Sequence, residues 1–365
     1  MLALAFALSA SAVPCVAAVP DVSPLANLQA RLGEAASRAP GHVAIAVEDL
    51  ATGLSTGINA TASMPAASTI KIPVMVEVFR QMADGTIDLN TKLHVTGADK
   101  DYGWGDLADA RAGTMRNVKQ LLWLMITESD NTATNMLIRL VGRLHVNREM
   151  ASLGLSHTRL NDDIRTNTEA VRTALRSSPK DMMRLLDAIA RDRLVDSWSS
   201  REMLAILAGQ HHNGLLPQPL PAGIEIAHKT GSLHDTLDDV GIVYRDDEPY
   251  VIAVMTTNLP TLDQGRHWIH GVSRIAYDEL GRFAQWRQDS GIAAFDPHAA
   301  QPVAPRILAE PISPDETMWT GGMGTGNAAP VLQPIGDPNA AGVAPAETVA
   351  TPPAGEPLLP AGSQR

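Results

Sequence analysis

The chain has 365 residues, of which 45% are hydrophobic, and it carries a formal net charge of −11 at pH 7. This length can bury one large core or two lobes. A negative chain without a cluster of Lys and Arg argues against binding to nucleic acid or to an anionic membrane. We therefore expect a monomeric protein whose partner is a small molecule.

Residues 1–20 predict the remnant of a signal peptide. Residues 2–19 form an Ala, Leu and Val run that Pro14 interrupts and that is too short to span a bilayer. Small residues at 16–18 offer a cleavage site, so we expect export to the periplasm or the medium. Cys15, the sole cysteine of the sequence, falls in this run, which leaves the mature protein without a disulfide or a catalytic thiol. Because Pro14 precedes it, Cys15 is a poor candidate for lipid attachment.

The folded part is expected at residues 24–290. It begins with a helix at residues 24–38 and a strand at residues 42–49, which has a weak partner near Leu54. A long helical stretch then runs to about Leu207.

Strands return only late in the chain. Residues 224–228, 239–244 and 250–257 are apolar runs joined by turn residues, which is the pattern of an antiparallel meander. An amphipathic helix follows at residues 266–287. The early and late strands should share one sheet, so we predict an α+β fold: an antiparallel sheet flanked by the terminal helices, with an all-helical lobe inserted at about residues 88–207. The cleft between sheet and lobe is where a ligand site is expected.

From residue 297 to residue 365 the sequence accumulates Pro, Ala and Gly and loses apolar periodicity, which predicts a disordered tail. The glycine-rich run at residues 322–326 has no predicted strand before it and no predicted helix after it, so it does not fit a nucleotide-binding loop. We interpret it as flexible linker.

The first motif, Ser-Thr-Ile-Lys at residues 68–71, opens an apolar helix. We expect Ser68 at the helix N-cap, where its hydroxyl faces the positive helix end, and Lys71 one turn further on the same face. An ammonium group against apolar neighbours would be poorly solvated, which lowers its pKa and lets the free amine accept a proton. Serine and amine then form a nucleophile with its base. The spacing alone is not diagnostic, because residues 177–180 repeat it at what we interpret as a simple helix start.

The second motif, Ser-Asp-Asn at residues 129–131, lies between two predicted helices, which makes it a buried corner rather than a loose loop. The Ser129 hydroxyl can relay a proton there to a leaving nitrogen, and Asn131 can bind both Lys71 and a substrate amide. Asp130 can fix the corner through backbone N–H groups. The alternative is that the three residues only cap the following helix.

The third motif, Lys-Thr-Gly-Ser, ends the strand predicted at residues 224–228. The side chains suited to bind a substrate carboxylate are those of Lys229, Thr230 and Ser232. Gly231 lets a ligand approach the backbone, and the N–H groups of Ser68 and Ser232 can form an oxyanion hole. Alternatively, the motif is an exposed strand end that finishes in a turn.

The three motifs in this order resemble the signature set of class A β-lactamases and related penicillin-recognising serine hydrolases. The resemblance covers roughly residues 25–287 and includes the segment around the second motif, residues 128–142. It implies that Ser68 is acylated and that Lys71 and Ser129 move protons. By the same resemblance, the substrate is held by Asn131, Lys229, Thr230 and Ser232.

Two loops bear on how far the resemblance goes. The family carries an aromatic residue beside the cleft in the loop where this chain has Tyr102 and Trp104, and either can take that place. The family's Ω-loop carries a Glu separated by two residues from a Leu-Asn pair, and this motif is absent from residues 161–169. Release of an acyl-serine needs an activated water, for which a carboxylate is the usual base. The candidates are Asp162, Asp163 and Glu169, unless these are only solvated loop charges.

Other chemistries fit less well, and we expect neither a metal nor a cofactor. The histidines show no zinc spacing, and no Gly-x-Ser-x-Gly elbow supports a Ser-His-Asp triad. His228, beside Lys229, is interpreted as structural.

The leading hypothesis is hydrolysis of the β-lactam amide through an acyl-enzyme on Ser68. One alternative is a D-alanyl-D-alanine carboxypeptidase or transpeptidase, for which the missing Glu is no handicap. The other is a penicillin-binding sensor whose adduct persists and whose tail binds a partner.

Overall fold

The computed structural model describes residues 24–166, 169–245 and 249–291. The expected signal-peptide remnant, which includes Cys15, and the Pro-rich tail lie outside the described residues. No helix within the described ranges has the length and the apolar character needed to cross a membrane.

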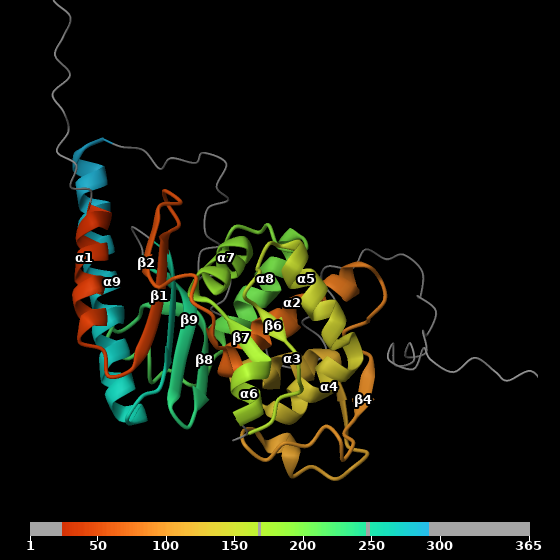
Figure 1. The fold of residues 1–365 in the computed structure, drawn as a ribbon. Coiled ribbons are helices and arrows are strands. Elements are labelled where there is room, and N and C mark those ends of the chain that lie inside the picture. The colour runs from red at the N-terminus through yellow and green to blue at the C-terminus, as the bar shows by residue number, and fades with distance from the viewer. Residues whose placement is uncertain (1–23, 167–168, 246–248, 292–365) are drawn as a thin grey trace, which may run out of the picture. The chain divides into compact units, whose positions relative to one another are not determined.

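A five-stranded antiparallel sheet carries the fold (Figure 1). Its strands are β1 (His42–Asp49), β2 (Ser55–Ile58), β8 (Glu225–Leu233), β9 (Thr236–Tyr244) and β10 (Tyr250–Thr257). Their order across the sheet is β2-β1-β10-β9-β8. Early β1 pairs with late β10, His42 lying opposite Thr257, which confirms that strands from both ends of the chain share one sheet.

The terminal helices α1 (Pro24–Ser37) and α9 (Leu262–Asp289) lie side by side on one face of this sheet (Figure 1). Leu28 of α1 and Ile269 of α9 are fully buried in one cluster with Val254 of β10. Burial of each such side chain stabilises the fold by roughly 1.5–3 kcal/mol before the entropy cost is counted. α9 begins four residues earlier than the sequence pattern suggests because Thr261 caps it, accepting a hydrogen bond from the Gln264 N–H at 3.2 Å.

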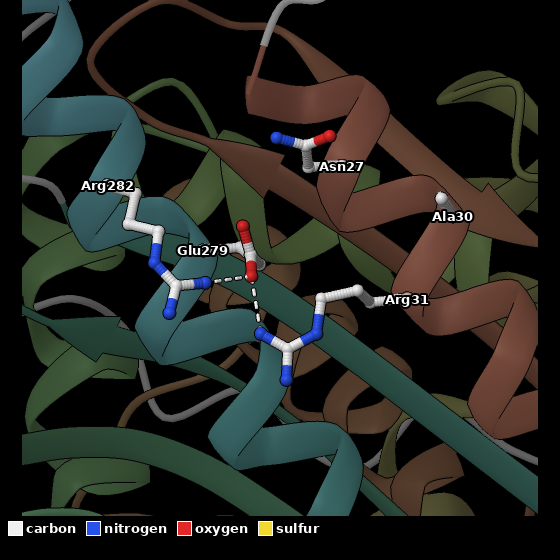
Figure 2. Close-up of a pocket in the computed structure, with 5 residues that line it drawn as sticks. All are labelled: Asn27, Ala30, Arg31, Glu279 and Arg282. Carbon is white, nitrogen blue, oxygen red and sulfur yellow. Dashed lines mark hydrogen bonds and ion pairs between the residues drawn. The ribbon is translucent and has the colours of Figure 1, made fainter.

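A surface hollow of about 310 Å³ opens between these two helices (Figure 2). Its lining residues are Asn27, Ala30, Arg31, Glu279 and Arg282. Arg31 of α1 and Arg282 of α9 both pair with the buried Glu279 carboxylate of α9, so the Arg31–Glu279 ion pair joins the two helices at the hollow.

The opposite face of the sheet is covered by the middle of the chain. Its helices are η1 (Ala67–Ile70), α2 (Lys71–Ala83), η2 (Asp106–Ala108), α3 (Val118–Thr127), α4 (Asn131–Val141), α5 (Arg143–Ser152), α6 (Glu169–Ala174), α7 (Pro179–Ala190) and α8 (Ser197–Ala208). The lobe predicted at residues 88–207 is mainly helical, as expected, but it also contains short strands. These are β4 (Lys92–His94) paired with β5 (Met115–Asn117), and β6 (Arg159–Leu160) paired with β7 (Leu175–Ser177), which also pairs with β3 (Met64–Pro65).

The repeat of the first motif at residues 177–180 is the helix start that the sequence predicts. Ser178 is the N-cap of α7 and accepts a hydrogen bond from the Asp181 N–H at 3.1 Å. Pro179 occupies the first turn, where its missing N–H costs nothing.

β8 is longer than the sequence analysis predicts, since it runs through the third motif to Leu233. The motif is therefore part of a strand rather than the turn that follows one. Side chains alternate across the sheet, so Lys229 faces the helical lobe with Ala227, while His228 faces α1 and α9 with Ile226.

Asp238 of β9 is a fully buried acid on the lobe-facing side of the sheet, opposite Gly231 of β8. One of its carboxyl oxygens accepts a hydrogen bond from the Thr256 N–H at 2.9 Å, and the other has no partner among the described residues. Burial raises the pKa of Asp238 well above its ordinary value, and the bond from Thr256 opposes this rise. Asp238 therefore releases its proton at a higher pH in the folded chain than in the unfolded chain, where the pKa of an aspartate is about 4.

This difference predicts that Asp238→Asn is more stable than the wild type at neutral pH. The asparagine keeps the acceptor for the Thr256 N–H and removes the cost of holding an acid protonated, so thermal unfolding should shift upward by a few degrees. The shift should shrink as the pH falls toward about 4, where the unfolded chain is protonated as well. Melting curves across this pH range test the prediction, with the exposed Asp109→Asn as the matched control. A shift that stays constant with pH would contradict it.

Candidate active site

Ser68 lies in a tight turn rather than at an α-helix N-cap as the sequence suggested. It belongs to η1, whose own cap position, Ala66, offers no side-chain hydrogen bond. The preceding residue, Ala67, has a φ of 41°, a left-handed conformation that is strained for a residue with a Cβ. η1 continues directly into α2, and the Ser68 side chain is half-buried.

Lys71 is the first residue of α2 and is fully buried. Its Nζ donates hydrogen bonds to the Ser129 carbonyl oxygen at 2.6 Å and to Asn131 Oδ1 at 2.7 Å, and it lies 3.1 Å from Ser129 Oγ. Burial lowers the pKa of Lys71 well below its ordinary value, and the charge of Lys229 lowers it further, against the opposing charges of Asp130 and Asp101. The first and second motifs therefore meet at the Lys71 amine.

The second motif forms a rigid corner between α3 and α4. Ser129 has a φ of 57°, and the next residue, Asp130, is the N-cap of α4. The Asp130 carboxylate accepts hydrogen bonds from the Ala133 N–H at 2.7 Å and the Leu107 N–H at 2.9 Å. Capping and site assembly are thus not alternatives: Asp130 caps the helix, and this frees Ser129 and Asn131 to face Lys71.

The third motif passes directly beside the turn that contains Ser68. A Cβ added at Gly231 would lie 3.1 Å from the Ser68 nitrogen and 3.0 Å from Ala67 Cβ, so a larger residue here would require the Ser68 turn to shift by a few tenths of an ångström. Lys229 is fully buried, and its Nζ donates to the Thr230 carbonyl oxygen at 3.0 Å. Burial lowers the pKa of Lys229 to about 7, although the charge of Asp239 opposes this shift.

Thr230 and Ser232 are half-buried on either side of Gly231. The strand therefore carries two half-buried hydroxyl groups close in sequence to the fully buried Lys229 amine. Gly231 lies beside the Ser68 nitrogen, and Ser232, whose N–H the sequence analysis assigns to an oxyanion hole, is the next residue of β8.

His228 lies on the far side of the same strand from Lys229. Its Nδ1 is 2.8 Å from Asp239 Oδ1 and its Nε2 is 2.9 Å from Asn213 Oδ1. Both ring nitrogens are thus engaged in a buried network that ties β8 to β9 and to the loop after α8.

The three carboxylates considered for water activation have arginine neighbours. Asp162 is 3.3 Å and Asp163 is 3.7 Å from Arg143, and Asp163 is also 3.4 Å from Arg165. Glu169 is 76% exposed and lies 3.8 Å from Arg172. Among the described residues of this loop, Thr166 reaches the site, and its Oγ1 is 3.2 Å from Asn131 Nδ2.

Sequence reasoning missed Asp101, which is almost fully buried and accepts a hydrogen bond from Asn131 Nδ2 at 2.8 Å. It also missed His212, which packs edge-on against Trp104 with 5.5 Å between ring centroids. Trp104 is 48% exposed and its carbonyl oxygen accepts the Asn131 N–H at 3.0 Å, so it is the loop aromatic tied to the second motif. Tyr102 points into solvent, 73% exposed. No sequence motif marks Asp101 or His212.

Among the described residues, no group of three or more His, Cys, Asp or Glu side chains is placed to hold a metal ion. The hollow of Figure 2 contains none of the motif residues, because it lies between α1 and α9 on the other side of the sheet.

Comparison with known proteins identifies one family. The model of a family described as the β-lactamase enzyme family matches residues 27–280. Among curated proteins, none matches the chain.

Several solved structures share the fold. A β-lactamase from Sphaerobacter thermophilus is 31% identical, with a TM-score of 0.65 over 70% of this chain and 97% of that chain. PBP-A is 30% identical, with a TM-score of 0.67 over 71% of this chain and 97% of that chain. A variant of PBP-A, with the same identity and coverage, was solved as an acyl-enzyme complex with penicillin G.

Proposed function

Since the chain belongs to the β-lactamase enzyme family, we propose that it is a serine hydrolase that opens the β-lactam amide through an acyl-enzyme on Ser68. The observation that carries this proposal is the contact of Lys71 with the second motif. A fully buried amine with a lowered pKa, hydrogen-bonded to Ser129 and Asn131 and one helical turn from Ser68, is the base that a serine nucleophile needs.

Acylation then proceeds by proton transfers within this cluster. Lys71 Nζ takes the proton of Ser68 Oγ, and Oγ attacks the carbonyl carbon of the lactam. The N–H groups of Ser68 and Ser232 hold the developing oxyanion. The C–N bond breaks, the leaving nitrogen takes a proton from Ser129 Oγ, and Ser129 recovers a proton from Lys71, which returns the amine to its neutral form.

The carboxylate of the substrate is bound by the third motif. The Lys229 ammonium supplies the charge, and the hydroxyls of Thr230 and Ser232 supply hydrogen bonds. Gly231 keeps this strand in contact with Ser68, which sets the distance between the carboxylate and the reacting carbonyl. A substrate amide can take the Asn131 N–H that lies 3.2 Å from Thr166 Oγ1.

One observation favours a second candidate, a D-alanyl-D-alanine carboxypeptidase or transpeptidase. Among the described residues of the loop, the one beside Asn131 is Thr166, and the acids of the same loop lie near arginines. Such a site acylates well and releases a β-lactam slowly, which suits a peptidase or a penicillin-binding sensor. Release of D-alanine from a cell-wall peptide would identify the peptidase. A lasting penicillin adduct without D-alanine release would identify the sensor.

We predict that Ser68→Ala forms no adduct with benzylpenicillin, because the attacking oxygen is gone. Intact-protein mass spectrometry should show the wild type gaining the mass of one penicillin, and the variant gaining none. Ser177→Ala, which changes the serine of the second Ser-x-x-Lys sequence, is the matched control and should still form the adduct. An adduct on another residue of Ser68→Ala would contradict the assignment.

A second prediction concerns pH. Binding of a carboxylate needs the charged form of Lys229, whose pKa is about 7, so the second-order rate constant of acylation should fall as the pH rises through about 7. Lys229→Arg keeps the charge at every accessible pH and should move this descending limb to higher pH, even if its plateau is lower. Stopped-flow acylation over the pH range measures both limbs. Coincident descending limbs would remove Lys229 from this role.

The third prediction addresses release of the acyl group. If the loop supplies the base, then replacing Asp162, Asp163 and Glu169 singly by Ala should lengthen the adduct lifetime at one position by about tenfold or more. Time-resolved mass spectrometry after removal of free penicillin gives the lifetimes. Three unchanged lifetimes would show that none of these acids activates the water.

A further inference from the structure

Asp101 is an acid that the catalytic steps above do not use. It lies in the loop between β4 and η2 and is 8% exposed. Its Oδ1 accepts hydrogen bonds from Asn131 Nδ2 at 2.8 Å, Thr166 Oγ1 at 2.5 Å and the Gly103 N–H at 3.0 Å, and its Oδ2 accepts the Thr166 N–H at 2.7 Å. Burial alone would raise the pKa of Asp101, but these hydrogen bonds outweigh it and lower the pKa. Asp101 is thus an ionised acceptor rather than a proton carrier.

The carboxylate determines which way the Asn131 amide faces. An asparagine presents a carbonyl oxygen on one side and an NH₂ group on the other, and its neighbours decide the orientation. Because ionised Asp101 can only accept, the NH₂ group of Asn131 must face it. The carbonyl oxygen then faces Lys71 at 2.7 Å.

The orientation of the Asn131 amide determines which groups the lone pair of Lys71 Nζ can reach. A neutral amine has two N–H donors and one lone pair. The Ser129 carbonyl oxygen at 2.6 Å and Asn131 Oδ1 can only accept, so they engage the two N–H groups of Lys71. The lone pair is left for the hydroxyl groups of the site. If the Asn131 amide were turned round, its NH₂ group would face Lys71 and compete for that lone pair.

We propose that Asp101 is a positioning residue for acylation, which fixes the Asn131 amide so that the lone pair of Lys71 is free to take the proton of Ser68. This inference rests on the proposed function for its catalytic meaning. It adds a carboxylate from outside the three motifs to the machinery of the site.

The neighbouring loops are built to keep this contact. Thr166 closes over Asp101 with both its N–H and its hydroxyl. A Cβ at Gly103 would overlap Thr166 Oγ1, so the glycine leaves room for that closure. The Asp101 N–H also lies 3.2 Å from Thr132 Oγ1 of α4, which joins the loop to the helix that carries Asn131.

The charges that act on Lys71 come from three elements. Lys229 of β8 lowers its pKa, while Asp130 at the start of α4 and Asp101 of the loop raise it. Loss of the Asp101 charge should therefore lower the pKa of Lys71. An amide NH₂ turned toward the amine would favour the neutral form as well, so both effects have the same sign.

The test is Asp101→Asn, which keeps the size of the side chain. Asn131 Nδ2 and the Thr166 N–H donate to different oxygens of Asp101, and an asparagine offers only one oxygen, so the constraint on the Asn131 amide is weakened. We expect the plateau rate of acylation by benzylpenicillin to fall about tenfold or more, and its ascending limb to move to lower pH. Asp106→Asn, which changes an exposed acid at the start of η2, is the charge-matched control and should leave both unchanged. Asp101→Ala, which adds no donor, replaces the asparagine variant if that variant does not fold.

If Asp101 has a purely structural role, Asp101→Asn should reduce the fraction of protein that benzylpenicillin can label and leave the ascending limb of the pH profile in place. That result would overturn the proposal. The same holds if Asp101→Asn lowers the plateau equally in wild-type and Asn131→Ala backgrounds, because the effect must pass through Asn131.

A titration of Lys71 by NMR of ¹³C-labelled lysine needs no substrate, and a pKa that is not lower in Asp101→Asn refutes the proposal. If the wild type forms no adduct with penicillin, the proposed function fails, and this titration still decides the role of Asp101.

Discussion

Burial of the Lys71 amine is the constraint on which the rest of the site depends. An ammonium group out of water is costly unless it is paired, so the amine lowers its pKa and becomes a base. Its N–H groups still need acceptors, and the Ser129 carbonyl oxygen and Asn131 Oδ1 provide them at 2.6 and 2.7 Å. A second buried amine, Lys229, repels any charge on the first. The site thus holds two lysines of which one can stay neutral while the other binds an anion.

This arrangement requires strained backbone that only a firm scaffold can hold. Ala67 and Ser129 both have a positive φ, of 41° and 57°, at the residues next to and within the motifs. The first conformation is held against β8, where Gly231 allows contact with the Ser68 nitrogen. The second is held by Asp130, which caps α4. Strain of this kind gathers at functional sites because the surrounding packing compensates for it.

The proposed acylation and the release of the acyl group depend on different parts of the site. The proposed acylation uses Ser68, Lys71, the second motif and β8, which lie together in the structure. Release of the acyl group needs an activated water, and the loop brings a threonine to Asn131 while its acids lie near arginines. Thr166 is held by Asp101 through both its N–H and its hydroxyl. The loop therefore supports the orientation of the Asn131 amide. The lifetime of an acyl adduct depends on which other groups reach the adduct.

The sequence by itself determined the α+β fold, the shared sheet and the three motifs, because apolar periodicity and short polar signatures are local properties. It did not determine that Ser68 sits in a 3₁₀ turn or that the third motif lies within β8, since both depend on packing between the sheet and the lobe. Nor did it reveal Asp101, thirty residues before Asn131 and in no motif. Its role arises when two loops fold over α4, and only the tertiary structure brings those groups within hydrogen-bond distance.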